Sequence, residues 1–156
     1  MVFTLQKTQI IPLSLRESWE FFSNPYNLPK ITPDSLSFSI VGIQPPEKIY
    51  AGLAIRYKVS PILGIPLTWV STITNVVEEK LFVDQQLVGP YRLWHHQHHF
   101  KEHTLGTEMV DIIHYKPWAI PGLASAVNSM IVLPQLSKIF EHRRKSIEKL
   151  FGTTAA

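Results

Sequence analysis

The polarity of the chain alternates with a period of two residues from Leu36 to Lys116, and this pattern does most to limit the possible folds. Such alternation is typical of strands that bury one face. Turn residues divide the stretch into six predicted strands, over residues 36–43, 53–60, 66–77, 81–88, 92–103 and 107–116. Several connections are short, so we expect neighbouring strands to run antiparallel.

The residues before this stretch predict one more strand and two short helices. Apolar and β-branched residues from Phe3 to Ile11 indicate the strand. Ser14 and Glu17 have the spacing of a capping box, which indicates the start of a short helix. Residues 26–31 are expected to add one further helical turn.

Beyond Pro121-Gly122 the spacing of apolar residues changes to three and four, which predicts a long amphipathic helix. A bend is expected near Pro134, because proline has no N–H to donate. The whole order indicates an α+β domain in which a curved antiparallel sheet of about seven strands is covered by the C-terminal helix. At 156 residues, the chain should form a single domain over residues 1–151, followed by a tail at 152–156.

The composition excludes several classes of site. The chain has no cysteine, which rules out disulfides, zinc–thiolate sites, iron–sulfur clusters and thiol nucleophiles. Its net charge of +3 is concentrated between Lys138 and Lys149 instead of forming a broad basic stripe, so we expect no nucleic-acid partner. The first residues do not resemble a secretion signal, and a cytoplasmic location is expected.

Two segments raise the question of a membrane. Residues 117–137 are uncharged, but they include three prolines and several polar side chains, so we expect a buried or cavity-lining helix and no transmembrane segment. Arg143, Arg144 and Lys145 form a basic cluster on the last helix. Either this cluster contacts anionic lipid, or it is a solvated face that suits the negative end of the helix dipole.

The strand pair 92–103 and 107–116 is the most informative, because the Leu105-Gly106 turn leaves little freedom in its register. A tight hairpin brings even-numbered positions of the first strand opposite odd-numbered positions of the second. The apolar side chains of Trp94, Phe100, Met109, Ile113 and Tyr115 then share the inward face. The same face also carries His96, His98 and Asp111.

Buried polar side chains need partners, since an unpaired one costs about 1–3 kcal/mol. Three explanations are open for this cluster: a cross-strand pair between His98 and Asp111, a polar patch in a ligand cavity, or a metal site made by His96, His98 and Asp111. The sequence does not fix the geometry that a metal would need, so none is expected. The opposite face carries His95, His99 and His114, which we expect to be solvated. Alternation alone does not decide whether Asp84 and Gln86 on strand 81–88 face inward.

Several local strings resemble those of the START-like (SRPBCC, helix-grip) superfamily, which includes birch-pollen-allergen-like proteins and polyketide cyclases/dehydrases. One string includes Phe22, Asn27-Leu28 and Ile31-Thr32-Pro33. A second runs from Phe82-Val83-Asp84 through Gly89-Pro90-Tyr91 to Trp94, His96, His98 and Phe100, and is followed by Asp111 and Tyr115. The likeness is greatest to the bacterial ligand-binding members of the cyclase/dehydrase-like branch. It implies a sheet that grips the C-terminal helix around an apolar cavity, and the superfamily contains both carriers and enzymes.

From the pattern and the resemblance we expect the chain to bind a hydrophobic small molecule, such as a lipid, polyketide or isoprenoid, as a carrier or sensor, in a monomer or homodimer without cofactors. The alternative is a cyclase or dehydratase in which His98, oriented by Asp111, is the general base and Tyr115 donates to an oxyanion. The expected ligand-binding residues are Trp69, Trp94, His96, His98, Phe100, Met109, Asp111, Ile113, Tyr115, Met130 and Phe140.

Overall fold

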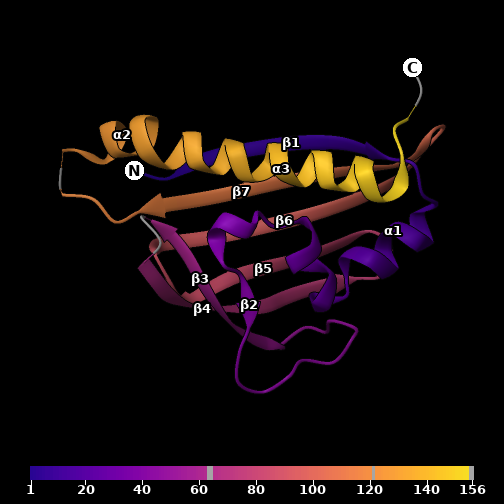
Figure 1. The fold of residues 1–156 in the computed structure, drawn as a ribbon, viewed down its shortest axis with the longest axis horizontal. Coiled ribbons are helices and arrows are strands. Elements are labelled where there is room, and N and C mark those ends of the chain that lie inside the picture. Colours follow the sequence, from indigo (N-terminus) through magenta and orange to yellow (C-terminus); the bar gives the residue numbers. More distant parts are fainter. Residues whose placement is uncertain (63–64, 121, 155–156) are drawn as a thin grey trace.

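The computed structural model describes residues 1–62, 65–120 and 122–154, and it contains one antiparallel sheet of seven strands. The spatial order of the strands is β1-β7-β6-β5-β4-β3-β2, so β2 to β7 form a meander and β1 closes onto β7 (Figure 1). The strands are β1 (Phe3–Ile11), β2 (Ser39–Ile40), β3 (Ala54–Ile62), β4 (Ile65–Val77), β5 (Leu81–Val88), β6 (Tyr91–His103) and β7 (Gly106–Pro117). The expected α+β fold with about seven strands is confirmed.

One predicted strand is much shorter than expected. Residues 36–43 alternate in polarity, but only Ser39–Ile40 pair, with Lys58 and Tyr57 of β3. The 3-10 helix η2 (Asp34–Leu36) occupies the start of the predicted strand, and Ser37 then adopts a left-handed conformation. Gly42 has a positive φ of 79°, which ends the extended backbone on the other side. Local turn geometry therefore overrides the alternation.

The two short helices after β1 are present. Helix α1 (Leu15–Phe22) begins with the predicted capping box: Ser14 accepts from the backbone N–H of Glu17, whose side chain accepts from the backbone of Ser14. The second, η1 (Pro25–Ile31), is a 3-10 helix capped by Asn24. In Figure 1 these helices lie over the part of the sheet that the long helix leaves open.

The C-terminal helix has an interruption ahead of Pro134. The helical segment comprises α2 (Ala124–Val127), the π-helical η3 (Asn128–Val132) and α3 (Leu133–Phe151). Pro134 lies in the first turn of α3, where a missing N–H is tolerated. The interruption in the structure is the π-helical turn that precedes Pro134, and the bend expected at Pro134 itself stays a prediction. No helix in the described residues is both long enough and apolar enough to span a bilayer.

Helix α3 packs on the inner face of the sheet along β1, β7 and β6 (Figure 1). Leu136 and Phe140 join a core with Trp94, Ile113 and Tyr115. One end of the molecule is closed by a second core, in which Ile147, Trp19, Phe82, Phe100 and Met109 take part. On the other strands a third core surrounds Ile55, Tyr57 and Ile73. The space between these three cores is where the cavity lies.

Candidate functional site

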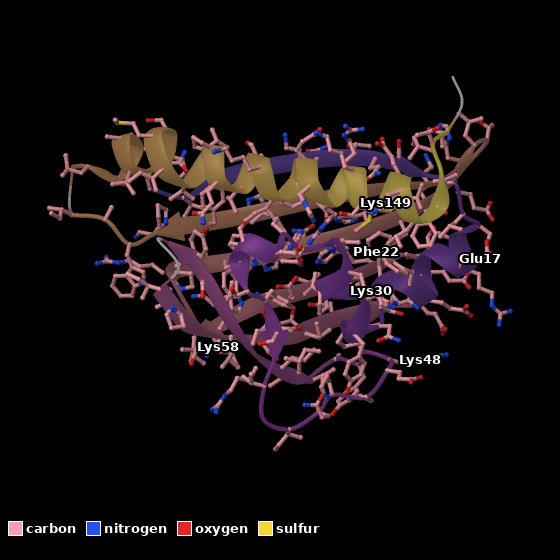
Figure 2. All side chains as sticks on the ribbon, in the orientation of Figure 1. Glu17, Phe22, Lys30, Lys48, Lys58 and Lys149 are labelled. Carbon is pink, nitrogen blue, oxygen red and sulfur yellow. The ribbon has the colours of Figure 1, made fainter. Side chains whose placement is uncertain are left out.

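A cavity of about 200 Å³ lies between the inner face of the sheet, the two short helices and α3. Its walls are mostly apolar and include Phe22, Leu28, Ile55, Tyr57, Trp69 and Trp94. Phe22, labelled in Figure 2, comes from α1, and Trp69 and Trp94 come from β4 and β6. The rings of these two tryptophans meet edge to face, with centroids 5.2 Å apart. The fold therefore forms a partly open cavity lined by aromatic and aliphatic side chains.

Four charged or titratable side chains form the polar end of this cavity: Asp84 from β5, His96 and His98 from β6, and Arg143 from α3. Strand register brings Asp84 and the two histidines together, because Asp84 pairs with His96, and His98 pairs with Asp111 of β7. The alternation within β6 places both imidazoles on the inner face. Asp111 lies directly behind them and is 6% exposed.

The two imidazoles lie between two carboxylates. On one side, His96 Nε2 donates to Asp111 Oδ1 at 2.9 Å, and His98 Nδ1 approaches the same oxygen at 2.9 Å without hydrogen-bond geometry. On the other side, His98 Nε2 donates to Asp84 Oδ2 at 3.0 Å, while His96 Nδ1 lies 3.6 Å from that oxygen. The ring centroids of the two histidines are 3.8 Å apart. The predicted juxtaposition of His98 and Asp111 is present, within a larger cluster.

The cluster shifts the pKa values of its members in different directions. Burial alone would raise the pKa of Asp111, but the hydrogen bond from His96, the close approach of His98 and the charge of Arg143 hold it well below its usual range. Asp84 behaves in the same way: burial opposes ionisation, and the hydrogen bond from His98 with the nearby positive charges lowers its pKa. Both carboxylates are therefore ionised at neutral pH.

The two histidines respond oppositely to this environment. Burial, reinforced by repulsion from His98, lowers the pKa of His96 despite the nearby carboxylates. Burial also opposes a charge on His98, but its contacts with Asp111 and Asp84 outweigh that effect and raise its pKa. We infer that His96 is the neutral member of the pair and that His98 is the one that gains a proton first.

Arg143 supplies a further positive charge to the cluster. Its side chain is only 12% exposed, and its Nη1 lies 3.6 Å from Asp111 Oδ1. The guanidinium also lies over the ring of Phe140, 5.0 Å from its centroid. A second, smaller cavity of about 170 Å³ lies on the far side of Asp111 and Arg143, against β1 and α3. These two residues thus separate a mostly apolar cavity from a more polar one.

The structure distributes the predicted site residues over several locations. Trp69, Trp94, His96 and His98 line the larger cavity, and Asp111, Met109 and Phe140 line the smaller one. Phe100 and Ile113 belong to the packed cores. Met130 was expected in the cavity wall, but it is 78% exposed on η3, so that expectation is wrong.

The proposed catalytic set is also not assembled as expected. The hydroxyl of Tyr115 donates to Asn128 Oδ1 at 2.7 Å, and both residues are buried. Tyr115 lines neither cavity and is 1% exposed. The hydroxyl proton of Tyr115 is therefore donated across the contact between β7 and η3, and it does not point toward a substrate beside His98.

Sequence reasoning missed two members of the cluster, Asp84 and Arg143. Strand β5 buries side chains on both faces, Phe82 at 6% and Val83 at 5% exposure, so apolar alternation did not identify the face of Asp84. The register between β5 and β6 would have revealed it, because Asp84 lies opposite His96.

Arg143 had been assigned to a basic surface cluster with Arg144 and Lys145. The cluster is not one surface: Arg143 faces the interior, whereas Arg144 is exposed and forms ion pairs with Glu141 and Glu148. The suggestion that all three side chains contact lipid is therefore wrong. On a helix, consecutive residues point about 100° apart, which is enough to send one of them inward.

No family model and no curated protein matches this chain. Solved structures, by contrast, match it over nearly its whole length. Protein CV1439 from Chromobacterium violaceum is 11% identical, with 96% of this chain and 98% of that chain covered and a TM-score of 0.72. Major latex-like protein 151 from Panax ginseng is 15% identical, with 97% and 98% covered and a TM-score of 0.69. Protein Ms6760 from Mycobacterium smegmatis is 18% identical, with 94% and 92% covered and a TM-score of 0.66.

Identities this low establish a common fold and nothing about a shared ligand. The likeness nevertheless extends over the sheet, the short helices and the C-terminal helix together, since at least 94% of this chain is covered in each case. With its curved seven-stranded antiparallel sheet and long C-terminal helix, the chain shares the helix-grip fold of these solved structures.

Proposed function

We propose that the protein binds a small, largely apolar molecule carrying one polar group in the larger cavity. The observation that supports this most is the composition of the cavity: aromatic and aliphatic walls with charged side chains gathered at one end. Binding sites of this kind gain affinity from removing apolar surface from water, and a few polar groups fix the orientation of the ligand.

The size of the cavity limits the ligand. At about 200 Å³, it is smaller than the roughly 300–1,000 Å³ of sites for drug-sized ligands. We therefore favour a compact ring compound over a long-chain lipid. The edge-to-face pair of Trp69 and Trp94 offers aromatic surface to such a ring.

The polar end favours a ligand group that donates a hydrogen bond. Asp84 is ionised and lines the cavity, so it is an acceptor for a hydroxyl or amine of the ligand. Arg143, which also lines the cavity, supplies donors for a carbonyl oxygen. A catalytic role has less support, because the hydroxyl of Tyr115 is bonded to Asn128 and lies outside the cavity.

The proposal can be tested with 2-naphthol, a ring compound with one hydroxyl, using isothermal titration calorimetry on metal-free protein. Val59 lines the cavity at 5% exposure, and Val59→Trp would place a large ring system inside it. We expect this variant to bind at least about tenfold more weakly than the wild type, equivalent to about 1.4 kcal/mol.

Val77→Trp is the matched control, because Val77 is 49% exposed and does not line the cavity. Its affinity should equal that of the wild type. Circular dichroism would establish that both variants fold, and Ile55→Phe offers a second cavity-filling change from β3. Equal affinities in all these variants, or no binding by the wild type across a panel of small aromatic alcohols and ketones, would contradict the proposal.

A further inference from the structure

The arrangement at the polar end goes beyond what is needed to orient an apolar ligand. Asp84 and the two histidines each offer a ligand atom, and these three atoms all lie within 4.8 Å of one another. His96 and His98 are 5% and 6% exposed, and all three residues line the cavity. Two imidazoles and one carboxylate with an open side are a donor set that suits divalent first-row transition metals.

The distances on the side of Asp84 are compatible with coordination. Asp84 Oδ2 lies 3.0 Å from His98 Nε2 and 3.6 Å from His96 Nδ1. Bonds of about 2.0–2.1 Å from a metal to nitrogen or oxygen place neighbouring ligand atoms about 2.9–3.4 Å apart. The two distances to Asp84 Oδ2 therefore lie within a few tenths of an ångström of those in a coordinated ion, and the two histidine nitrogens lie within 4.8 Å of each other.

Asp111 holds the opposite edges of the same two rings. His96 Nε2 donates to Asp111 Oδ1, and His98 Nδ1 lies 2.9 Å from that oxygen. Metal-binding histidines usually give their second nitrogen to a carboxylate, which fixes the tautomer and turns the first nitrogen toward the ion. Asp111 occupies this supporting position for His96 and lies beside the second nitrogen of His98, and Arg143 offsets its charge.

The proton positions leave a gap that a cation would fill. With the proton of His96 on Nε2, directed at Asp111, its Nδ1 presents a lone pair. That lone pair faces the ionised Asp84 across 3.6 Å, a distance too long for a hydrogen bond. Asp84 Oδ2 accepts a hydrogen bond from His98 Nε2 but has none to His96 Nδ1, so a cation bound by all three atoms would also satisfy the lone pair of His96.

We propose that Asp84 Oδ2, His96 Nδ1 and His98 Nε2 bind a divalent first-row transition metal at the polar end of the cavity. On binding, the doubly protonated His98 releases the Nε2 proton that it shares with Asp84 to solvent and keeps its proton on Nδ1, beside Asp111 Oδ1, so that a neutral imidazole binds the ion. The remaining coordination positions face the cavity, where water or a carbonyl or hydroxyl oxygen of a ligand completes the shell. The metal site shares Asp84 and the cavity with the proposed binding of apolar molecules, but metal binding does not require such a molecule.

The outer face of β6 supplies an internal control. His95 and His114 lie there with ring centroids 6.1 Å apart, and His95 Nδ1 is hydrogen-bonded to Gln85. Neither belongs to a group of metal-compatible ligands within the described residues. Adventitious binding to the half-buried imidazoles of this pair would depend on them, whereas the proposed site would not.

The experiment is a titration of chelator-treated full-length protein with Co²⁺, followed by visible ligand-field absorption, and with Zn²⁺ in competition. We expect one equivalent of Co²⁺ to bind the wild type. Asp84→Asn, which preserves shape, and His98→Ala should abolish the absorption bands. Asp111→Asn should weaken binding about 10- to 100-fold, as for other residues that support a ligand. The double variant His95→Ala/His114→Ala should bind as the wild type does.

A measurement on the wild type covers the case in which the variants fail to fold. In nitrogen-15 NMR spectra of the histidine side chains, Zn²⁺ should shift His96 Nδ1 and His98 Nε2 and leave His95 unchanged. The proposal is overturned if the wild type binds no stoichiometric metal, if binding survives Asp84→Asn, or if it disappears in the His95→Ala/His114→Ala variant. Because 2-naphthol binding is measured on metal-free protein, failure of one proposal leaves the other separately testable.

Discussion

Replacement of Arg143 by methionine should destabilise the protein strongly, because it removes the cation that faces the buried carboxylate of Asp111. Two unit charges 3.6 Å apart attract by about 4.6 kcal/mol at an effective dielectric constant of 20. Breaking one side of a buried ion pair typically costs about 3–5 kcal/mol. Methionine keeps an apolar side chain against Phe140, so the change acts mainly on charge. We expect a loss of about 3–5 kcal/mol in the free energy of unfolding.

The assay is urea denaturation monitored by circular dichroism, with Arg144→Met as the matched control. Arg144 is the neighbouring residue on α3, is 43% exposed and pairs with Glu141 and Glu148 at the surface, so its replacement should cost clearly less. Asp111→Asn should in turn reduce the effect of Arg143→Met, since the two side chains interact directly. Equal losses at positions 143 and 144, or additive effects in the double variant, would refute the reasoning that Arg143 balances the cluster.

Three further predictions concern stability. Tyr115→Phe leaves the side-chain oxygen of buried Asn128 without its donor and should cost about 1–3 kcal/mol by thermal denaturation; an unchanged melting temperature would contradict a structural role. Gly106→Ala should destabilise the protein by more than about 1 kcal/mol. The φ of Gly106 is +132°, and an added Cβ would lie 2.1 Å from the carbonyl oxygen of Ile11. An unchanged melting temperature in the same assay would show that the turn adapts. The pKa of Asp111 is lowered from 3.8, so the stability that its carboxylate contributes is complete above that pH and is lost as the pH falls through the folded-state pKa. The urea midpoint should therefore drop more steeply on acidification in the wild type than in Asp111→Asn. Parallel curves for the two proteins would disprove this.

Strict local constraints made much of the fold predictable from the sequence. The Leu105-Gly106 turn fixed the register of one hairpin, and His98 does lie opposite Asp111 and Trp94 opposite Tyr115. The Ser14 capping box correctly placed the start of α1. These features depend on neighbouring residues or on the two-residue period of strands, so one sequence contains the information needed.

The candidate site was only partly predictable, because it depends on how distant elements meet. Asp84 belongs to the cluster because the β5–β6 register places it opposite His96. Arg143 belongs to it because its side chain points inward from α3, whereas that of Arg144 lies at the surface. Periodicity placed Met130 on the apolar side of a continuous helix, but the π-helical turn Asn128–Val132 lies at that position and the side chain is exposed. A π-helical turn changes the direction in which the side chains after it point, and no simple sequence pattern predicts such a turn.

We propose that the charged end of the partly open cavity between the sheet, the short helices and α3 orients a small ligand. A crystal structure of the protein soaked with 2-naphthol tests it most directly. The account predicts electron density for the ring beside Trp69 and Trp94, with the hydroxyl within hydrogen-bond distance of Asp84. Side chains that fill the cavity in the crystal, with 2-naphthol absent from it or bound only at the surface, would contradict the account.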